Sequence, residues 1–537
     1  MVVDKGWAIV LTGLALVAGP AAAQGANSSP VAAAQHCASL AGFTLPGSTL
    51  LITKAEPVPP AAPGTVKASP FGPPLAIGMP AWCRVEGSLE RRTGVGGKHY
   101  EIDFALALPD GWNGRFLFQG GGGLNGSVNP PLGAQTAGAA PALARGFAVV
   151  STDSGHKGAV FDAGFMQDQQ AALNFAEGSV GKVTSVAKAL VAAYYGRPAD
   201  HSYFAGCSTG GREAMLASER YPDQFDGVVA GDPAMRTGYS NLALAWATQA
   251  FNAAAPRDAA GKPEAAKLFS AGDKALLISS LLSSCDGLDG SVDGLIFDPG
   301  ACRFDPAVLT CKAAKTDACL SKAQVTALKT AFAGPKTRGG VQVYPLYPWD
   351  TGIAATGQGI PGFLPSSAPS ILGALVPSAN KLDVDAAAAP AAADGVGSLV
   401  DTANWTNLSG FFGHGGKILY YHGLSDPWFS PVDTLDYYRR LAVANGGAEA
   451  VQGSSRIFLV PGMGHCQGGQ ATLDEFDLLG AVVDWVEHGK APDSVVATGA
   501  NMPGLSRPLC AWPTHAQYSG SGDPKLAASY QCRIDRD

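Results

Sequence analysis

The segment 203–214 limits what this chain of 537 residues can fold into more than any other stretch. It reads Tyr-Phe-Ala-Gly-Cys-Ser-Thr-Gly-Gly-Arg-Glu-Ala, so a short aromatic run leads into a glycine-rich turn and then into helix-forming residues. In the pattern Gly-x-Ser-x-Gly, the turn from strand to helix is so tight that small residues must flank the serine two positions away. The segment therefore predicts a buried strand, a sharp turn at Ser208 and a helix.

Further strand and helix signals alternate along the chain. Short β-branched or aromatic runs, bounded by Gly, Pro or Asp, predict strands at 100–108, 115–119, 146–152, 203–206, 417–422 and 456–460. Apolar residues spaced by three and four predict a helix over 177–195. The alternation predicts an α/β fold with a parallel sheet covered on both faces. The Ala- and Pro-rich residues before Pro80 predict a loop-rich wrap instead.

The stretch 235–404 differs in composition from the rest of the chain. It holds four cysteines, acidic loops and segments rich in Pro, Gly and Ser, and strand signals resume at Lys417. A chain of this length favours two domains or one domain with a large insertion. We therefore expect residues 24–234 and 405–537 to form two parts of one sheet domain, with 235–404 inserted between them.

The N-terminal residues 1–23 resemble a targeting segment. Lys5, the apolar stretch 7–18 and small residues up to Ala23 predict a cleaved signal peptide, with a buried helix as the alternative because Asp4 weakens the basic start. No later stretch approaches the roughly 18 unbroken apolar residues of a membrane span. The net charge of −7, without any basic run, argues against a nucleic-acid partner. A secreted or periplasmic protein is expected.

The ten cysteines support export, because an even number in a chain with a signal peptide indicates disulfides. None has the CxxC spacing of zinc or redox sites. Pairing near neighbours in sequence would give Cys37–Cys83, Cys285–Cys302, Cys311–Cys319 and Cys510–Cys532, and would leave Cys207 and Cys466 for each other. Spacing alone does not determine this connectivity.

A serine on such a turn can act as a nucleophile if a base and an orienting acid lie nearby. On α/β-hydrolase sheets the order is Ser, acid, His, each on a loop after a strand. Asp426 follows the predicted strand 417–422, and His465 follows the predicted strand 456–460 in a glycine-rich loop. We therefore predict a catalytic triad of Ser208, Asp426 and His465.

Several other residues compete for these roles. His422 lies inside a predicted strand and His156 precedes the serine, so both are interpreted as packing or hydrogen-bonding residues, and His414 is a third candidate. Asp433 and Asp436 fall in a helical stretch and are interpreted as surface acids.

Cysteines flank both predicted partners of this triad. Cys207 precedes Ser208 and Cys466 follows His465. A disulfide between them would keep their Cα atoms within about 7 Å and bring the two loops together.

The arrangement Cys207-Ser208, Asp426 and His465-Cys466 resembles the tannase and feruloyl esterase family, which includes mono(2-hydroxyethyl) terephthalate hydrolases. The resemblance covers essentially the whole mature chain, including the pairing of all ten cysteines. It implies an α/β-hydrolase domain with a large lid at 235–404, and ester hydrolysis through an acyl-enzyme. A catalytically silent binding protein on the same fold is the alternative from another class.

The glycine-rich segment 120–126 follows the predicted strand 115–119 and lacks the lysine of a phosphate-binding loop. It is interpreted as part of an oxyanion hole, in which glycines let backbone N–H groups approach a substrate, with a mobile surface turn as the alternative. The resemblance implies Gly123 as one donor, with the N–H of Thr209 as the other.

The segment 285–295 places three carboxylates within eight residues. Oxygen ligands at such spacing suit calcium, although no Glu closes an EF-hand loop and an acidic loop is more often simply solvated. The resemblance implies a structural Ca²⁺ in the lid. Its ligands would be the side chains of Asp286, Asp289 and Asp293 and the carbonyls of Ser291 and Leu295.

Trp428 and Phe429 follow the predicted acid closely enough to wall an aromatic acyl group, and Phe429 matches a substrate-pocket position of the family. The terephthalate-ester hydrolases hold a carboxylate with a lid arginine, but this chain has no arginine between Arg338 and Arg439. The expected substrate is therefore a small neutral aromatic ester of the feruloyl (hydroxycinnamoyl) type, free or attached to a polysaccharide or polyphenol. Galloyl esters, other aryl esters and terephthalate monoesters remain alternatives.

Overall fold

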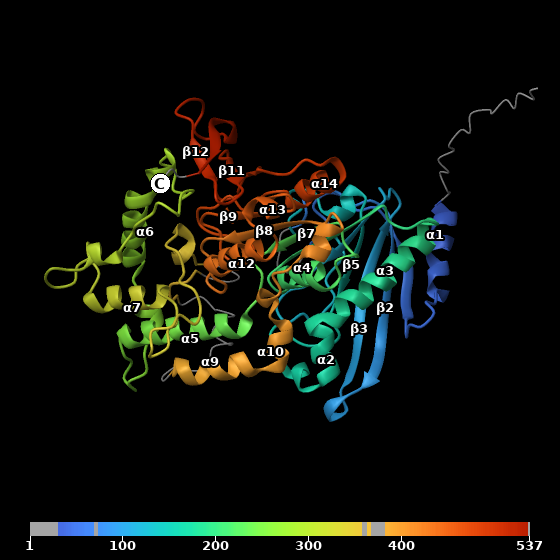
Figure 1. Cartoon of the computed structure of the whole chain (residues 1–537), viewed down its shortest axis with the longest axis horizontal. Helices are drawn as coiled ribbons and strands as arrows, with labels where there is room; N and C mark the ends of the chain where they lie inside the picture. The colour runs from blue at the N-terminus through green and yellow to red at the C-terminus, as the bar shows by residue number, and fades with distance from the viewer. Residues whose placement is uncertain (1–29, 69–73, 357–361, 367–381, 535–537) are drawn as a thin grey trace, which may run out of the picture.

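A nine-stranded sheet forms the centre of the molecule (Figure 1). The structure, a computed structural model, describes residues 30–68, 74–356, 362–366 and 382–534, so the predicted signal peptide at 1–23 lies outside the described residues. In spatial order the strands are β1 (Leu51–Val58), β2 (Trp82–Thr93), β3 (His99–Pro109), β5 (Ala148–Thr152), β4 (Arg115–Gln119), β6 (His201–Cys207), β7 (Gly227–Gly231), β8 (Lys417–Gly423) and β9 (Ser455–Val460).

The sheet is mostly parallel, as predicted. The six strands from β5 to β9 in this order pair in parallel, whereas β1, β2 and β3 form an antiparallel edge, and β3 pairs antiparallel with β5. The prediction of a loop-rich wrap before Pro80 is wrong at Leu51–Val58, which is β1. This strand is largely exposed at the sheet edge, where Pro57 is tolerated because no partner needs its missing N–H. Lys54, Glu56 and Pro57 interrupt its apolar residues, which hides the strand from a search for apolar runs.

Helices cover both faces of the sheet, again as predicted. Phe118 and Phe204 share one core with α3 (Ser179–Tyr195), α4 (Thr209–Arg220) and α12 (Pro431–Ala444). Their strand neighbours Leu117 and Tyr203 share the opposite core with α14 (Leu478–His488). Since side chains alternate along a strand, these pairs show that both faces are buried.

The longer helices between β7 and β8 are α5 (Thr237–Ala254), α6 (Ala271–Cys285), α7 (Lys322–Phe332), α9 (Val384–Ala393) and α10 (Gly395–Val400). Of these, α10 packs against the sheet domain, where Val400 shares a cluster with Tyr100 and Phe175. Within the described residues the segment between β7 and β8 adds no strand to the large sheet, and Phe251, Leu277 and Leu328 belong to a core of its own. In Figure 1, α5, α6 and α7 lie on the opposite side of the molecule from α1 (Pro30–Ser39) and β2.

Two small sheets complete the C-terminal part, one of β10 (Ser494–Ala497) with β11 (Arg507–Cys510), the other of β12 (His515–Tyr518) with β13 (Tyr530–Arg533). The shorter helices are α2 (Gln169–Leu173), α11 (Ser409–Gly413) and α13 (Ala448–Gln452). No helix in the described ranges is long and apolar enough to cross a bilayer.

Candidate active site

Ser208 lies on a strained turn between β6 and α4. Its backbone has φ +63° and ψ −124°, a conformation that a residue with a side chain rarely adopts, and its N–H donates to the Gly231 carbonyl over 3.0 Å. A Cβ atom on Gly206 would lie 2.5 Å from the Gly210 carbonyl oxygen, and one on Gly210 would lie 2.7 Å from that of Gly121. The two glycines of the Gly-x-Ser-x-Gly pattern are therefore required by close backbone contacts.

Asp426 and His465 form a hydrogen-bonded pair at the ends of β8 and β9. The His465 Nδ1 and Asp426 Oδ2 atoms are 2.7 Å apart, and both side chains are buried. The other carboxylate oxygen, Oδ1, accepts the backbone N–H groups of Trp428 at 2.8 Å and Phe429 at 3.0 Å. The loop after β8 thus fixes the carboxylate, and the carboxylate fixes the imidazole.

The electrostatics of this pair keep the carboxylate ionised. Burial acts to raise the pKa of Asp426, but the neighbouring His465 and His422 outweigh it and hold the pKa below its ordinary value. For His465, burial acts to lower the pKa, and the Asp426 carboxylate outweighs it and raises the pKa. A histidine held in this way has an increased affinity for a proton.

A disulfide joins the loops that carry Ser208 and His465. Cys207 and Cys466 are bonded, with their Cα atoms 5.9 Å apart across 259 positions of sequence. The Nε2 atom of His465 is buried and has no hydrogen-bond partner among the described residues. Ser208, by contrast, is partly exposed. His465 Nε2 is therefore available for a hydrogen bond, and it lies on the loop that the disulfide joins to the Ser208 turn.

The glycine-rich loop after β4 lies against the start of α4. The Thr209 hydroxyl donates to the Gly123 carbonyl, so the two residues predicted for an oxyanion hole are in contact. The N–H of Gly120 donates to the Ala205 carbonyl, and that of Gly121 donates to Glu213. Within the described part of the chain, no backbone acceptor is found for the N–H groups of Gly122, Gly123 and Thr209.

Glu213 holds this loop, a role that sequence reasoning missed. It lies on α4, is buried, and accepts from the Gly121 N–H at 2.9 Å, the Asn125 Nδ2 at 2.7 Å and the Ser154 hydroxyl at 3.1 Å. One carboxylate thus joins the helix that follows Ser208 to the loops after β4 and β5. No local signal marked this role, because an acid next to Arg212 at the start of a helix looks like an ordinary solvated carboxylate.

The rival histidines have other surroundings. His156 is buried and stacks on Phe165 with ring centroids 3.5 Å apart, and burial lowers its pKa to about 4, so the interpretation as a packing residue is confirmed. His414 is exposed after α11. His422 is a hydrogen-bonding residue as predicted, but it also lies beside the acid, with Nε2 at 3.3 Å from Asp426 Oδ2.

The interpretation of Asp433 as a surface acid is wrong, because its side chain is buried in α12 and pairs with Arg236. An acid on a helix is usually solvated, and its distant partner gave no local signal. Asp436 is exposed, as predicted.

Aromatic rings line one side of His465. The rings of Trp428 and Phe429 stack on each other, and their centroids are 5.8 and 5.4 Å from that of His465. Phe161 lies 5.4 Å from Trp428. These rings make the surroundings of His465 apolar on one side.

The segment between β7 and β8 is hydrogen-bonded to the loop that carries Asp426 and to the loop that carries His465. The Tyr347 hydroxyl donates to the Trp428 carbonyl at 3.1 Å. Asp350 Oδ2 accepts from the Ser425 hydroxyl at 2.6 Å and from the Gly462 N–H at 2.7 Å. The segment 347–350 therefore bridges the loop of Asp426 and the loop of His465.

The acidic loop 286–295 contains a buried carboxylate oxygen without a partner. Among the described residues, nothing donates to Asp289 Oδ2, and burial together with the nearby Asp293 and Asp286 raises the pKa of Asp289 to about 7. Asp293 also pairs with the buried Arg507. The unpartnered oxygen of Asp289 fits an oxygen ligand of a divalent cation, whereas the carboxylate oxygens of Asp286, Asp289 and Asp293 do not all lie within 4.8 Å of one another in this structure.

All five disulfides suggested by near-neighbour pairing are present, namely Cys37–Cys83, Cys207–Cys466, Cys285–Cys302, Cys311–Cys319 and Cys510–Cys532. No free cysteine occurs in the described ranges. Five disulfides fit a protein that matures in an oxidising compartment.

A serine on the turn after β6, with a histidine–carboxylate pair after the last strands of a mostly parallel sheet, is typical of α/β-type ester hydrolases. The sequence profile described as "Tannase and feruloyl esterase" matches residues 83–366 and 372–533. The chain belongs to the tannase and feruloyl esterase family, and it is a carboxylic ester hydrolase.

Two relatives and two solved structures illustrate this similarity. A mono(2-hydroxyethyl) terephthalate hydrolase of Piscinibacter sakaiensis is 39% identical over 88% of this chain and 87% of its own. A probable feruloyl esterase of Arthroderma benhamiae is 30% identical over 93% and 94%. Feruloyl esterase B from Aspergillus oryzae superimposes with a TM-score of 0.76 at 26% identity, covering 93% of this chain and all of that one. Tannin acyl hydrolase from Aspergillus niger has the same fold, with a TM-score of 0.71 at 20% identity, covering 94% and 96%.

Proposed function

We propose that this chain hydrolyses aromatic carboxylic esters of the hydroxycinnamoyl type through an acyl-enzyme. Ser208 is the nucleophile, His465 takes its proton, and Asp426 orients the imidazole and stabilises its charged form. The observation that carries this proposal is the disulfide Cys207–Cys466, because it ties the serine turn to a histidine that is already hydrogen-bonded to a carboxylate.

The reaction follows from these positions. Ser208 Oγ attacks the ester carbonyl carbon while its proton moves to Nε2 of His465, the nitrogen without a partner. The backbone N–H groups of Gly123 and Thr209 donate to the oxyanion that forms. The imidazolium then protonates the leaving alcohol, and a water molecule, activated by His465, attacks the acyl-enzyme and releases the carboxylic acid.

The substrate class rests on the surroundings of His465. Trp428 and Phe429 offer aromatic faces beside the base, which suits a planar aromatic acyl group. The segment 235–404 acts as a lid over the two catalytic parts, 24–234 and 405–537, in agreement with the hydrogen bonds of Tyr347 and Asp350. The absence of arginine between Arg338 and Arg439 favours an acyl group without a free carboxylate.

A second candidate function is hydrolysis of terephthalate monoesters. It is favoured by the 39% identity to the terephthalate-ester hydrolase of Piscinibacter sakaiensis. Galloyl esters are a third substrate class within the same chemistry, as the shared fold with a tannin acyl hydrolase suggests.

Calcium, when bound, would be held by the carboxylates of Asp286, Asp289 and Asp293 with the carbonyls of Ser291 and Leu295. It would neutralise three nearby carboxylates and stabilise the loop, with no part in the reaction. The loop lies where two cores meet, since Leu295 belongs to the core next to α14 and the following Ile296 belongs to the core of the inserted segment. An ion that stabilises the loop would therefore stabilise this junction. Residues 1–23 direct export, to the medium or the periplasm.

The test is a comparison of kcat/KM for methyl ferulate, methyl gallate and mono(2-hydroxyethyl) terephthalate, with Ser208→Ala as the control. The highest value is expected for methyl ferulate, and the variant is expected to lose about 10³-fold or more. A preference for the terephthalate monoester would overturn the substrate class while leaving the chemistry intact. Wild-type rates in Ser208→Ala would overturn the chemistry itself.

A further inference from the structure

Asp232 is a buried carboxyl group beside the proposed triad to which no role has yet been given. It directly follows β7, the strand between β6 and β8, and its side chain has no exposed surface. Its φ of +35° lies in the left-handed region, which is unfavourable for a residue with a side chain. Its backbone N–H donates to the Tyr421 carbonyl at 2.9 Å. An acid kept in a strained and fully buried position indicates a function for its side chain.

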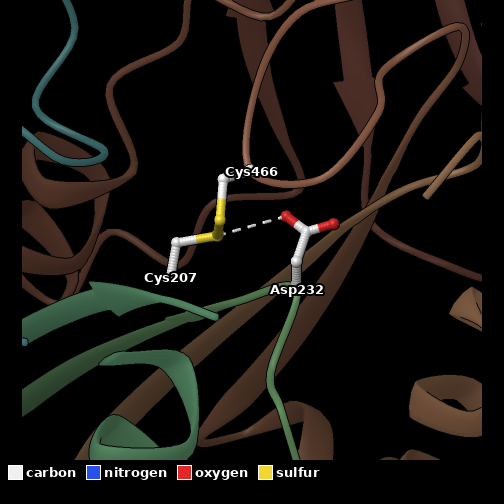
Figure 2. Close-up of side chains that lie close together, drawn as sticks. All are labelled: Cys207, Asp232 and Cys466. Carbon is white, nitrogen blue, oxygen red and sulfur yellow. Dashed lines mark hydrogen bonds between the residues drawn. A yellow bond between two sulfur atoms is a disulfide. The ribbon is translucent and has the colours of Figure 1, made fainter. Parts of the chain in front are cut away.

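The carboxyl group of Asp232 contacts the disulfide and both catalytic loops. Figure 2 shows it pointing at the bond between Cys207 and Cys466, with Oδ2 at 3.5 Å from Cys207 Sγ. Oδ1 accepts the N–H of Gly423 at 2.9 Å. A carboxylate oxygen of Asp232 also lies within 4.8 Å of ligand atoms of Asp426 and His465.

The contact with sulfur fits a protonated carboxyl group. A disulfide sulfur carries no hydrogen, so a hydrogen bond between Asp232 Oδ2 and Cys207 Sγ requires a proton on the carboxyl group. An ionised carboxylate would instead direct its lone pairs at those of the sulfur. The same carboxyl group accepts from Gly423 through its other oxygen, so a protonated Asp232 satisfies both contacts at once.

The charges around Asp232 point to the same state. From β8 it faces Tyr421 and His422, and from the loops after β8 and β9 it faces Asp426 and His465. The His422 Nε2 already meets the Phe429 carbonyl at 3.0 Å and Asp426 at 3.3 Å, and it is 3.6 Å from Asp232. One N–H cannot compensate two carboxylates. Burial raises the pKa of Asp232 to about 7, so the carboxyl group keeps its proton below pH 7 and loses it above pH 7.

We propose that Asp232 is a positioning residue of the active site that carries a proton when the enzyme works. Its O–H donates to Cys207 Sγ and its carbonyl oxygen accepts from Gly423, so it holds the loops of Ser208, Asp426 and His465 in register. This inference rests on the proposed function of the triad. When Asp232 is ionised, its negative charge beside His465 raises the pKa of the imidazole. His465 then becomes neutral, and able to accept the Ser208 proton, only at higher pH.

The test compares Asp232→Asn with Asp232→Ala. Asparagine keeps both contacts without a charge, because its oxygen accepts from Gly423 and its N–H donates to sulfur. We expect Asp232→Asn to keep kcat/KM at its plateau within about 3-fold and to leave the acidic limb of its pH profile within about 0.3 pH unit of the wild type, because Asp232 is already protonated in that range. Alanine loses both contacts, and we expect kcat to fall by about 10- to 100-fold with little change in KM.

Ser208→Ala and Asp426→Asn serve as reference variants, and circular dichroism with a thiol count confirms that each variant is folded and that the disulfide is intact. An Asp232→Asn variant as inactive as Asp426→Asn would show that an ionised carboxylate is needed, and would overturn the proposal. An acidic limb that moves down by about one pH unit in Asp232→Asn would show that Asp232 is ionised in the wild-type enzyme in that range, and would overturn the proposal as well. If Asp232→Ala does not fold, Asp232→Asn alone decides. Activity in Ser208→Ala would instead signal failure of the triad assignment.

Discussion

Cys207 and Cys466 form a disulfide between the residue before Ser208 and the residue after His465, with 5.9 Å between their Cα atoms. The serine turn leaves β6 and the histidine loop leaves β9, and β7 and β8 lie between these strands. A covalent bond therefore spans a gap of two strands at the edge of the sheet where the proposed reaction takes place. Its loss would affect the distance between nucleophile and base before it affects the core.

The variant Cys207→Ala/Cys466→Ala is expected to lose about 100-fold or more in kcat/KM, because small misplacements of reacting groups cost that much. It is also expected to lose about 3–5 kcal/mol in the free energy of unfolding. Rates on methyl ferulate and denaturant unfolding measure both. The matched control is Cys311→Ala/Cys319→Ala, which removes a disulfide of the inserted segment. Equal activity of the two double variants would contradict a special role for the first bond.

The variant Glu213→Gln is expected to lower kcat about 10-fold while leaving KM nearly unchanged. The amide presents an N–H₂ group to Asn125 or Gly121, which are both donors, so the loop that carries Gly123 is no longer held. Steady-state kinetics on methyl ferulate measure the effect. Glu449→Gln, on the exposed side of α13, is the control. A rise in KM without a fall in kcat would argue against an effect on the oxyanion hole.

The activity is expected to fall as the pH falls through the raised pKa of His465. The imidazole must be neutral to accept the Ser208 proton, and the Asp426 carboxylate raises its pKa above the ordinary 6.5. The half-maximal point of kcat/KM on the acidic side should therefore lie above pH 6.5. Asp426→Asn should lower the maximal rate about 10⁴-fold, as the loss of an orienting carboxylate does in serine proteases. A wild-type half-maximal point clearly below pH 6.5 would be inconsistent with this pair.

Removal of calcium is expected to lower the melting temperature by about 3–8 °C without changing kcat at a temperature where the protein stays folded. The reason is that three carboxylates of one loop would lose the charge that neutralises them. Melting with calcium and with a chelator tests this. Asp289→Asn should abolish the difference, whereas Asp317→Asn, on an exposed loop of the same segment, should retain it. Identical melting of the wild-type protein under both conditions would exclude a structural calcium.

Five of the six parallel strands could be predicted because each is a short buried run between turn residues. The predicted strand 115–119 matches β4 residue for residue, and the strands after which Asp426 and His465 stand are correct to within one residue. By contrast, β1 is an edge strand interrupted by Lys54, Glu56 and Pro57, and β7, Gly-Val-Val-Ala-Gly, has only three apolar residues between two glycines that look like turn residues. Local pattern fails at an edge strand that carries charged residues, and it also misses a buried central strand such as β7 when the glycines at its ends look like turn residues.

The supporting acids of the site could not be predicted in the same way. Asp232 accepts from a residue 191 positions away, and Glu213 from one 88 positions away. Nothing near either acid in sequence distinguishes it from a solvated carboxylate. The flanking cysteines were informative because a disulfide is a long-range contact whose two ends can be recognised by residue type.

The assignment of Ser208 as the nucleophile is tested most directly by labelling with a serine-directed fluorophosphonate, followed by mass spectrometry of the labelled peptide. The account predicts one phosphonate per chain, attached to Ser208, with labelling lost in Ser208→Ala and strongly slowed in Asp426→Asn. Modification of a different residue, or undiminished labelling of Ser208→Ala, would contradict it.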